Sequence, residues 1–485
     1  MAKRKNSERR PQRQHKRATA SQHDKAKRLH TRNNTRAKTR EARVPLVGHM
    51  QSAIASLASA MDRRMAFRLA IIVSGMLLAD DRRTASAWFV AGGVQDDWDR
   101  FYDAINSVGR ISFKLATVVL RLIVHKLPPM ARIVLGMDDS PTSRYGRHVE
   151  GAGVHHNPTP GPADGKWLYG HNWVCLALLA IHPMWGVIAL PLLSMLYVRA
   201  VDVPLLAEKY DWEFQTKHQL GVKLMKWFMT AIRELGVTAP VWLAVDGAYA
   251  AAPFLRPMMK LGVTVVSRLR KDACLFDLPP ELTSKKRGRP RTYGSNRISL
   301  AKRSAHKQGW ETMTYSCRGV EVTRQYKSFL ATSELTGGVI RVVILRFEND
   351  GWAPYFCTDP TVEVKDILET VAARWAIEEQ FHDVKEIWGA GQQQVRNVWS
   401  SIGCWNLNGW LYTLVELASW DACQTDLTDR SDRPWDNPDR RPSHADRHRT
   451  IAREMLQKQF LSALPDTPDS NKLLALFKSL VTLAT

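Results

Sequence analysis

The sequence is poor in cysteine and has no long unbroken apolar run. Its six cysteines among 485 residues are far apart and form no C-x-x-C pair, which argues against a disulfide scaffold and a zinc site. Reduced cysteines fit the interior of a cell. The apolar stretch Asn172–Val198 is interrupted by a turn-like cluster at His182–Gly186, whereas a membrane-spanning helix needs about 20 continuous apolar residues. We therefore predict a buried β-hairpin there.

Acidic residues are also scarce relative to basic ones. The chain has 47 Asp and Glu against 69 Lys and Arg, a net charge of +22. Residues 1–43 hold 16 of the basic residues, only three acids and almost no large apolar side chain. Such a segment cannot bury enough surface to fold alone, so we predict a disordered basic arm, either a solvated tail or an arm that binds phosphates. The charge favours a nucleic-acid partner over a membrane.

Residues 44–130 have the pattern of helices. Ala66–Leu78 is an apolar helix, and two short helices, Thr84–Ala91 and Asp97–Asn106, flank the turn at Gly92-Gly93. This arrangement is compatible with a helix-turn-helix-like unit, although many helical hairpins look the same. We therefore treat residues 44–130 as a helical, possible DNA-binding domain, with plain helical packing as the alternative.

From residue 131 the pattern becomes mixed α/β. Residues 131–270 give three strands, a helix, a strand, a helix and a strand, which predicts antiparallel pairing early and parallel pairing later. Residues 271–361 have strand character and form a predicted β-rich insertion. Residues 362–400 return to helix, and 401–485 form a helical C-terminal region, interrupted by a charged loop at Asp426–Arg449 that we expect to be paired within itself. Together these segments predict an α/β protein with a mixed sheet flanked by helices.

Two acidic residues follow apolar strands, the position where α/β sheets usually place ligands. Asp138 follows the strand that ends at Met137, and Asp246 follows the strand Val241–Val245. An isolated Asp after a strand is commonly a turn former. At 100° per residue, a single helix over 363–388 places Glu378 on the apolar face of that helix, where a carboxylate is costly unless it is paired or bound to metal. The alternative is a helix-stabilising pair between Glu378 and Arg374.

Three carboxylates from two strand ends and a helix suit a particular chemistry. Hard oxygen ligands select Mg²⁺ or Mn²⁺ rather than zinc. Two such ions held together activate a water or a 3′-hydroxyl and stabilise the leaving oxygen in phosphodiester cleavage. The sequence therefore predicts a site with two divalent cations.

Three blocks of the sequence resemble the catalytic blocks of DDE transposases from bacterial insertion sequences. They are Asp138-Asp139-Ser140, the run Val245–Tyr249 and the run Arg374–Glu378. Arg374, Glu378 and Lys385 match the Y-(2)-R-(3)-E-(6)-K signature of that group, whereas Val371 stands at its tyrosine position. The segment Gly262–Asp272 and the following KRGRPRTYG also resemble this group.

The resemblance implies an RNase H-like core and a set of site residues. Asp138, Asp246 and Glu378 would be the catalytic metal ligands, with Asp138 preferred to Asp139 because the family often carries D-G-T or D-D-T with the ligand first. Strand periodicity leaves that choice open, because a central strand is apolar on both faces. Arg374 and Lys385 would contact terminal DNA phosphates.

Further basic residues lie in the insertion. The tetrapeptide Arg287-Gly288-Arg289-Pro290 resembles an AT-hook core that lays arginines in a narrow minor groove. Arg291 adds charge beside it, and the alternative is a basic surface turn. His171 is expected to be a structural histidine in preference to a residue that supports the site.

The resulting expectation is a DNA transposase. It would bind the terminal inverted repeats of an insertion sequence as a homodimer, in the nucleoid of a bacterial cytoplasm, and would catalyse cleavage and strand transfer at two Mg²⁺ or Mn²⁺ ions. Two alternatives remain: an RNase H-like nuclease that cuts without joining, and a basic DNA-binding protein without enzymatic activity. A basic RNA-binding protein would explain the arm but not the three acids.

Overall fold

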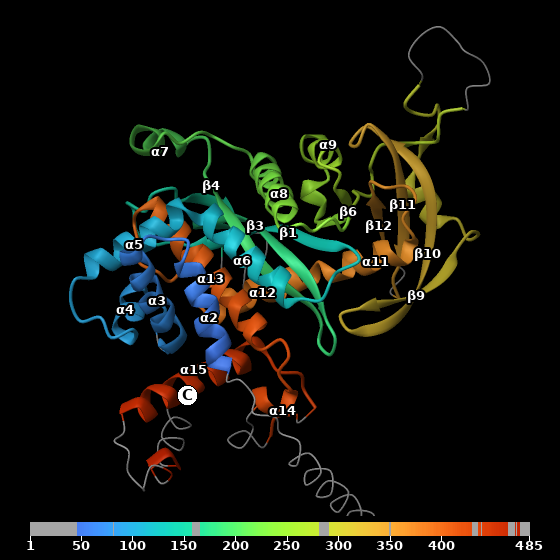
Figure 1. The fold of residues 1–485 in the computed structure, drawn as a ribbon. Helices are drawn as coiled ribbons and strands as arrows, with labels where there is room; N and C mark the ends of the chain where they lie inside the picture. The colour runs from blue at the N-terminus through green and yellow to red at the C-terminus, as the bar shows by residue number, and fades with distance from the viewer. Residues whose placement is uncertain are drawn as a thin grey trace, which may run out of the picture.

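The computed structural model describes most of the chain after the basic arm. The described residues are 46–80, 82–157, 165–280, 291–348, 351–428, 435–437, 439–463, 471 and 473–475. The predicted arm at 1–43, together with Arg287 and Arg289, lies outside these residues. Figure 1 shows a large twisted sheet with helices packed on both of its faces, which confirms the predicted mixed α/β class.

The centre of the sheet consists of five strands in the spatial order β4-β3-β1-β5-β6. β1 (Ile133–Ser143) pairs antiparallel with β3 (Trp167–His182), which pairs antiparallel with β4 (Gly186–Tyr197). On its other side, β1 pairs parallel with β5 (Val241–Val245), and β5 pairs parallel with β6 (Thr264–Arg268). The predicted hairpin and the predicted change from antiparallel to parallel pairing are both confirmed.

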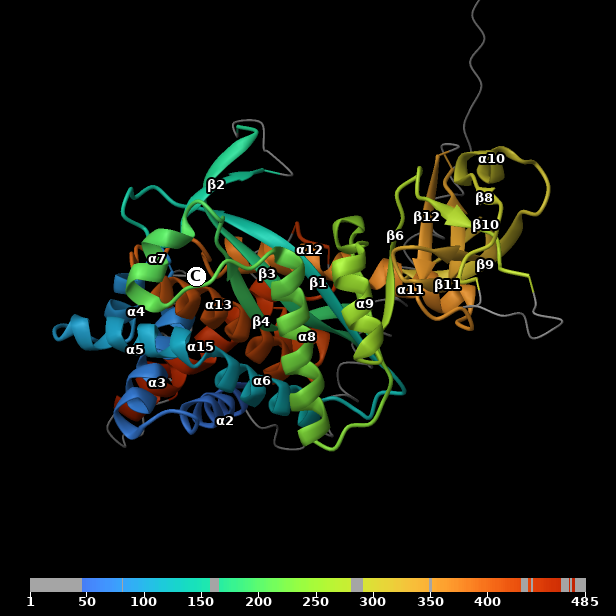
Figure 2. The same ribbon diagram turned by 90° about the horizontal axis from the view of Figure 1, so that it is seen from above.

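The strands of the predicted insertion continue the same sheet. β12 (Trp352–Cys357) pairs antiparallel with β6, β11 (Gly338–Arg346) pairs with β12, and β10 (Val320–Ser333) pairs with β11. β9 (Glu311–Cys317), β7 (Leu275–Phe276) and β8 (Arg297–Ile298) complete this part. The insertion is therefore joined to the core by backbone pairing, and Figure 2 shows its strands at one end of the sheet.

Different helices cover the two faces of the central strands. Gly136 of β1 lies under α12 (Trp375–Glu386), so closely that an added Cβ would lie 2.1 Å from Ile377 Cδ1. On the other face, Gly221 of α8 (Lys217–Glu234) would place a Cβ 2.8 Å from Met137 Sδ. Successive strand residues point to opposite faces of a sheet. The contact at Gly136 therefore places α12 on one face, and the contact at Met137 places α8 on the other, together with α9 (Ala252–Lys260).

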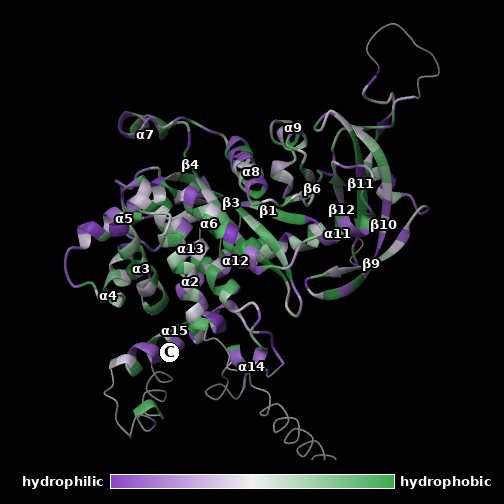
Figure 3. Cartoon of the chain, viewed as in Figure 1, coloured by the Kyte–Doolittle hydropathy of each residue, from purple (hydrophilic) through white to green (hydrophobic). Residues whose placement is uncertain are grey.

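A long helix, α13 (Val398–Ala418), forms the centre of the helical half. All but one of its residues are buried. Asn406 accepts a hydrogen bond from the Ser194 amide (2.9 Å) and donates to the Ser194 carbonyl (3.2 Å), which ties α13 to β4. Figure 3 shows the central strands as largely hydrophobic, with hydrophilic residues on outer helices such as α7 (Val203–Tyr210). No helix in the described part is long and apolar enough to cross a membrane.

The N-terminal helices pack around α13. They are α2 (Leu46–Ala58), α3 (Arg63–Leu78), α4 (Ala85–Ala91), α5 (Trp98–Arg110) and α6 (Ser112–Lys126). The two short helices flank Gly92 and Gly93 as predicted. α5 lies directly on α13, because an added Cβ on Gly109 would meet the Trp399 carbonyl oxygen at 1.9 Å.

The C-terminal region contains α14 (Gln424–Leu427) and α15 (His444–Ala463). We predicted that the loop extends to Arg449, and this end is wrong, because residues His444–Arg449 belong to α15. The expected pairing within this segment is present: Arg440 bonds Asp436 and Asp446, and Arg449 bonds Asp446.

Candidate active site

Asp138 lies inside β1, one residue past its last parallel pair with β5, and Asp246 directly follows β5. The predicted strand end at Met137 is wrong, because β1 continues to Ser143 by pairing with β3. In the parallel pairing of β1 with β5, Met137 is opposite Val245, so the next residues along the two strands are Asp138 and Asp246. The Asp246 carboxylate caps the short 3₁₀ turn Gly247–Tyr249 by accepting a hydrogen bond from the Ala248 amide (2.8 Å). The two acids thus lie together at the carboxyl edge of the parallel strands, as expected for a ligand site.

The two faces of β1 separate Asp138 from Asp139. Asp138 shares the face of Gly136, which is covered by α12. Asp139 points to the opposite face, where its carboxylate pairs with Lys217 of α8 at 2.6 Å. Of these two residues, only Asp138 therefore lies on the same face of β1 as Glu378. This geometry favours Asp138 over Asp139 as the partner of Glu378.

Glu378 does not occupy the apolar face that helical periodicity predicted. The predicted single helix over 363–388 consists of α11 (Val364–Ala373) and α12, with a break at Arg374. The Ile377 amide bonds the Arg374 carbonyl three residues back (3.0 Å), which tightens the turn there. The break changes the phase of the helix, so α12 buries Ile377 and Phe381. The Glu378 side chain, at 37% exposure, faces an open hollow instead.

Arg374 joins the first strand acid to the helical acid. Its Nη1 donates to Asp138 Oδ2 at 2.8 Å, and its Nη2 donates to Glu378 Oε1 at 2.8 Å. The pair between Glu378 and Arg374, which was the alternative interpretation of the sequence, is thus present. The same arginine also bonds Asp138, so it links the end of α11 and the start of α12 to β1. The bridge to Asp138 was missed, because no local pattern connects residues 236 positions apart.

Burial and neighbouring acids make Asp138 an unusual carboxyl group. Its burial is the main cause that raises its pKa, to about 7, and the nearby charges of Asp246 and Asp139 act in the same direction. Arg374 and the Asp139 amide oppose the shift. A carboxylate whose charge is this poorly compensated is a strong ligand for an additional cation, since a cation relieves both the repulsion and the desolvation.

Lys385, two turns beyond Glu378 on α12, is half-buried near Cys175, the β3 residue opposite Asp138. Burial lowers the pKa of its ammonium group. Among the described residues it forms no hydrogen bond or ion pair, so it is available for a phosphate.

The donor atoms of the site fit a divalent cation in type. Asp138, Asp246 and Glu378 offer only carboxylate oxygens, which Mg²⁺ and Mn²⁺ prefer. In the described ranges, however, no group of three His, Cys, Asp or Glu side chains is close enough to hold an ion. Arg374 already lies between Asp138 and Glu378, so the guanidinium takes the position of a cation there.

A hollow of about 430 Å³ opens on the Asp246 side of Arg374. Its walls include Asp246, Arg268, Arg318, Tyr355, Val371 and Trp375. Val371, at the tyrosine position of the signature, is accompanied here by Tyr355 from the insertion. Burial raises the pKa of the Tyr355 hydroxyl, and the charges of Arg268 and Arg374 oppose this shift, which places both cations near it.

Arg318 is a site residue that the sequence reasoning missed. It forms, with Gly319, the two-residue turn between β9 and β10, and both have positive φ (54° and 79°). That turn type favours Asn or Gly, and arginine in this conformation costs about 1 kcal/mol. Its guanidinium lies 3.9 Å from the centroid of the Trp375 ring, and this contact helps to offset the cost. An Arg-Gly pair between two strand patterns was the available signal.

The other predicted residues lie away from these contacts. Arg291 is exposed and donates to Ser295 Oγ (3.4 Å), while its neighbours Arg287 and Arg289 lie outside the described residues. His171 is fully buried on β3, where it accepts from Arg144 Nε (3.2 Å) and donates to the Glu150 carbonyl (3.0 Å). Burial lowers the pKa of His171 to about 3, so it is neutral and has the structural role that was expected.

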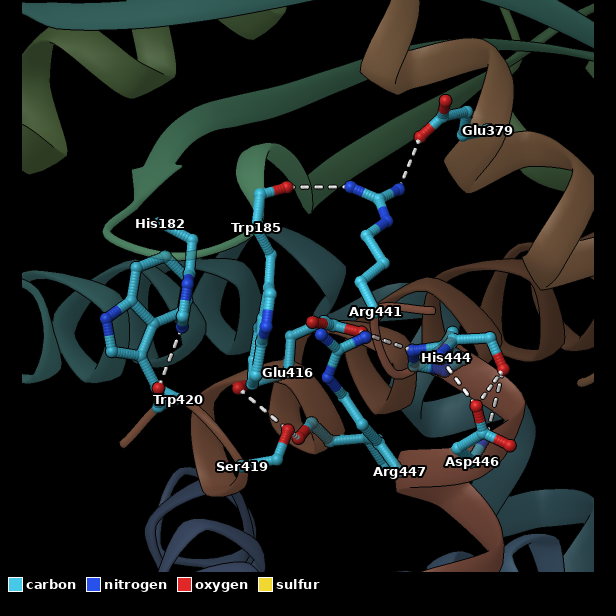
Figure 4. A network of polar contacts seen from close by, with 12 residues as sticks. His182, Trp185, Glu379, Glu416, Ser419, Trp420, Arg441, His444, Asp446 and Arg447 are labelled. Atoms are coloured by element: carbon cyan, nitrogen blue, oxygen red, sulfur yellow. Dashed lines mark hydrogen bonds and ion pairs between the residues drawn. The ribbon is translucent and has the colours of Figure 1, made fainter. Parts of the chain in front are cut away.

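A second, buried polar cluster lies beyond Glu378. A hollow of about 520 Å³ is bounded on one side by Glu378 and on the other by Glu416, His444 and Arg447. Glu416 Oε1 accepts from His444 Nδ1 at 2.6 Å and from Arg447 Nη1 at 3.4 Å, as Figure 4 shows. Trp388 Nε1 donates to His444 Nε2 at 2.9 Å, so both ring nitrogens of His444 have hydrogen-bond partners.

Comparisons with known proteins place the chain in a family. A similar solved structure is a piggyBac transposase synaptic complex with hairpin DNA, with 9% sequence identity and a TM-score of 0.38, covering 93% of this chain and 80% of that one. No curated protein matches the sequence. The family model of the DDE superfamily endonucleases matches residues 56–328, more than half of the chain. The chain therefore belongs to the DDE superfamily endonucleases.

Proposed function

We propose that the protein is a DNA transposase of an insertion sequence, with Asp138, Asp246 and Glu378 as its catalytic carboxylates. The observation that carries the proposal is their placement. Asp138 and Asp246 each follow the last pair of two adjacent parallel strands, and Arg374 bridges Asp138 to Glu378 on α12. Membership of the endonuclease family supports DNA cleavage, and the three-block resemblance favours transposition over cleavage alone.

The residues of the site have separable roles in this proposal. Asp138, Asp246 and Glu378 would hold Mg²⁺ or Mn²⁺, two ions when fully loaded, which supply an activated water or 3′-hydroxyl and stabilise the leaving oxygen. For Glu378 to join the other two acids, Arg374 must leave its bridge. The freed guanidinium then turns to a DNA phosphate, and Lys385 offers a second positive charge on the same helix. The enzyme would act as a homodimer that holds two terminal inverted repeats.

Strand transfer is the reaction that tests the proposal. The full chain would be incubated in Mg²⁺ with a duplex that carries one end of its element and with a plasmid target. We expect cleavage at the end and a joined product in which the freed 3′ end is linked to the plasmid. Cleaved ends without joined product would favour the RNase H-like nuclease, and binding without any cleavage would favour the non-enzymatic alternative.

A further inference from the structure

A two-stranded ribbon projects from the sheet beside the candidate active site. It is formed by β2 (Gly153–His156) and the start of β3, with His156 opposite Trp167, and the Asn157 amide extends it by bonding the Lys166 carbonyl at 2.9 Å. We define the ribbon as residues 153–157 and 165–170. In Figure 2 it extends away from the body of the molecule.

The two faces of the ribbon have opposite environments. The inner face carries His155, which is 7% exposed and lies 6.0 Å from the Tyr197 ring, centroid to centroid. The outer face carries Val154, His156 and Trp167, all exposed. The inner face therefore holds the ribbon on the body, and the outer face is left to solvent.

The outer face is unusually apolar for a surface that no described residue buries. Trp167 is 59% exposed and Val154 is 45% exposed, and Tyr145, in the loop that leads to the ribbon, is 96% exposed. Isolated exposed apolar residues are ordinary, but a cluster of them with aromatic rings marks an interaction surface.

The charge around this face indicates which partner it fits. Arg147 and Lys166 are exposed, and no described carboxylate pairs with either of them. The only acid in 144–157 and 165–171 is Glu150, which is occupied by Lys209 Nζ (2.7 Å), the Tyr210 hydroxyl and the Val398 amide. The Lys166 ammonium lies 5.9 Å from the centroid of the Trp167 ring, so charge and aromatic surface are adjacent. An aromatic surface beside cations that pair with no described carboxylate fits nucleic acid better than a second protein surface.

The ribbon is continuous with the strand that carries Asp138. β1 pairs with β3 as far as Ser143 and Gly170, where the ribbon begins. Ser143 lies five residue steps along the strand from Asp138, a span of roughly 17 Å. That span equals about five base pairs at 3.4 Å each.

We propose that the ribbon is a DNA-binding element that enters the major groove of the duplex about half a helical turn from the bond that is cut. This inference rests on the proposed function, because it concerns the same DNA. A two-stranded ribbon has the dimensions that the major groove admits. Trp167 and Val154 contact base edges or sugars, and Arg147 and Lys166 contact the flanking phosphates.

The test measures DNA affinity of full-length variants by fluorescence anisotropy, with a labelled 40-base-pair duplex of random sequence in buffer without Mg²⁺. Trp167→Ala should weaken binding about tenfold without changing its salt dependence. The double variant Arg147→Ala/Lys166→Ala should reduce the slope of log affinity against log salt by about 1.8, since each lost phosphate contact removes about 0.9. Trp435→Ala, which removes a tryptophan that is 79% exposed elsewhere, is the matched control and should bind as the unchanged protein does.

Unchanged affinity and slope in both ribbon variants would overturn the inference. It would also be overturned if Trp167→Ala altered the oligomeric state in gel filtration while DNA affinity stayed the same, since the face would then meet a second copy. The DNA affinity measured in this test does not depend on whether the protein cleaves DNA. Ribbon variants that lose DNA affinity in a protein that cuts nothing would contradict only the proposed function, whereas normal binding in a protein that cuts would contradict only the ribbon.

Discussion

Two clusters of acids and arginines lie on either side of Glu378, and they differ in how completely their charges are compensated. In the cluster of Glu416, His444 and Arg447, each side chain is at most 5% exposed, and the carboxylate is shared by an arginine and a histidine. In the cluster around Arg374, a single guanidinium serves both Asp138 and Glu378, while Asp246 adds further negative charge.

The comparison separates charges that hold the fold from charges that await a ligand. A buried network whose carboxylate is paired with both an arginine and a histidine links α13 to α15, and losing the carboxylate leaves the buried arginine uncompensated. A partly exposed group of acids with one cation contributes little to stability, because part of its charge is unpaired. Its excess negative charge is instead a source of affinity for metal ions.

The largest effect should follow from Glu378→Gln. The amide keeps the shape of the side chain but not the charge, so we expect the cleavage rate in Mg²⁺ to fall by about 10³-fold or more. The free energy of unfolding should change by no more than about 0.5 kcal/mol. Initial rates and urea unfolding measure the two quantities. A variant that unfolds easily, or that cuts at a normal rate, would contradict the division between the clusters.

Glu416→Ala should have the opposite profile. Removing the carboxylate leaves Arg447 buried without its partner, which should destabilise the protein by about 3–5 kcal/mol. Glu379→Ala is the matched control, because Glu379 is 46% exposed and pairs with the exposed Arg441, and it should cost at most about 1 kcal/mol. Urea unfolding compares the two. Equal losses would show that burial is not what distinguishes the network.

The pH dependence of stability should identify Glu416 as a charged group. Burial raises the pKa of this carboxyl, but Arg447 and His444 together lower it by more, so it lies below its usual value of 4.5. Its contribution is therefore present above about pH 4.5 and is lost as the pH falls through the lower pKa of the folded state. The gap in unfolding free energy between the unchanged protein and Glu416→Gln should narrow at low pH, and a gap that widened there would contradict this assignment.

A smaller effect is expected from Arg374→Gln in the protein without DNA. Removing the guanidinium that bridges Asp138 and Glu378 leaves both carboxylates free for a divalent cation, so the affinity for Mn²⁺ should rise by about tenfold. Isothermal titration with Mn²⁺ measures this directly. Weaker binding would mean that Arg374 positions the acids for the metal and does not compete with it.

The sequence predicted those features that depend on neighbouring residues. An apolar run followed by an acid is a local pattern, which is why the end of β5 before Asp246 could be identified. The same pattern gave the wrong end for β1, because the pairing of residues 138–143 with β3 is not a local feature. The hairpin of β3 and β4 could be predicted because two apolar runs flank a turn.

Features that depend on distant packing could not be predicted. Periodicity assumes a continuous helix, so the break at Arg374 gave the wrong face for Glu378. The choice between Asp138 and Asp139 depends on which face of β1 meets α12, through the contact of Gly136 with Ile377. The pairing of β12 with β6, which joins the insertion to the core, has no local sequence signal.

The most direct test of the account is end cleavage by Asp246→Asn. This substitution removes one negative charge from the acid that lies beside Asp138 and keeps its size. We predict that the variant binds a duplex carrying the element end as the unchanged protein does but produces no cleaved strand in Mg²⁺. Cleavage of that duplex by Asp246→Asn would contradict the assignment of the three acids as the catalytic centre.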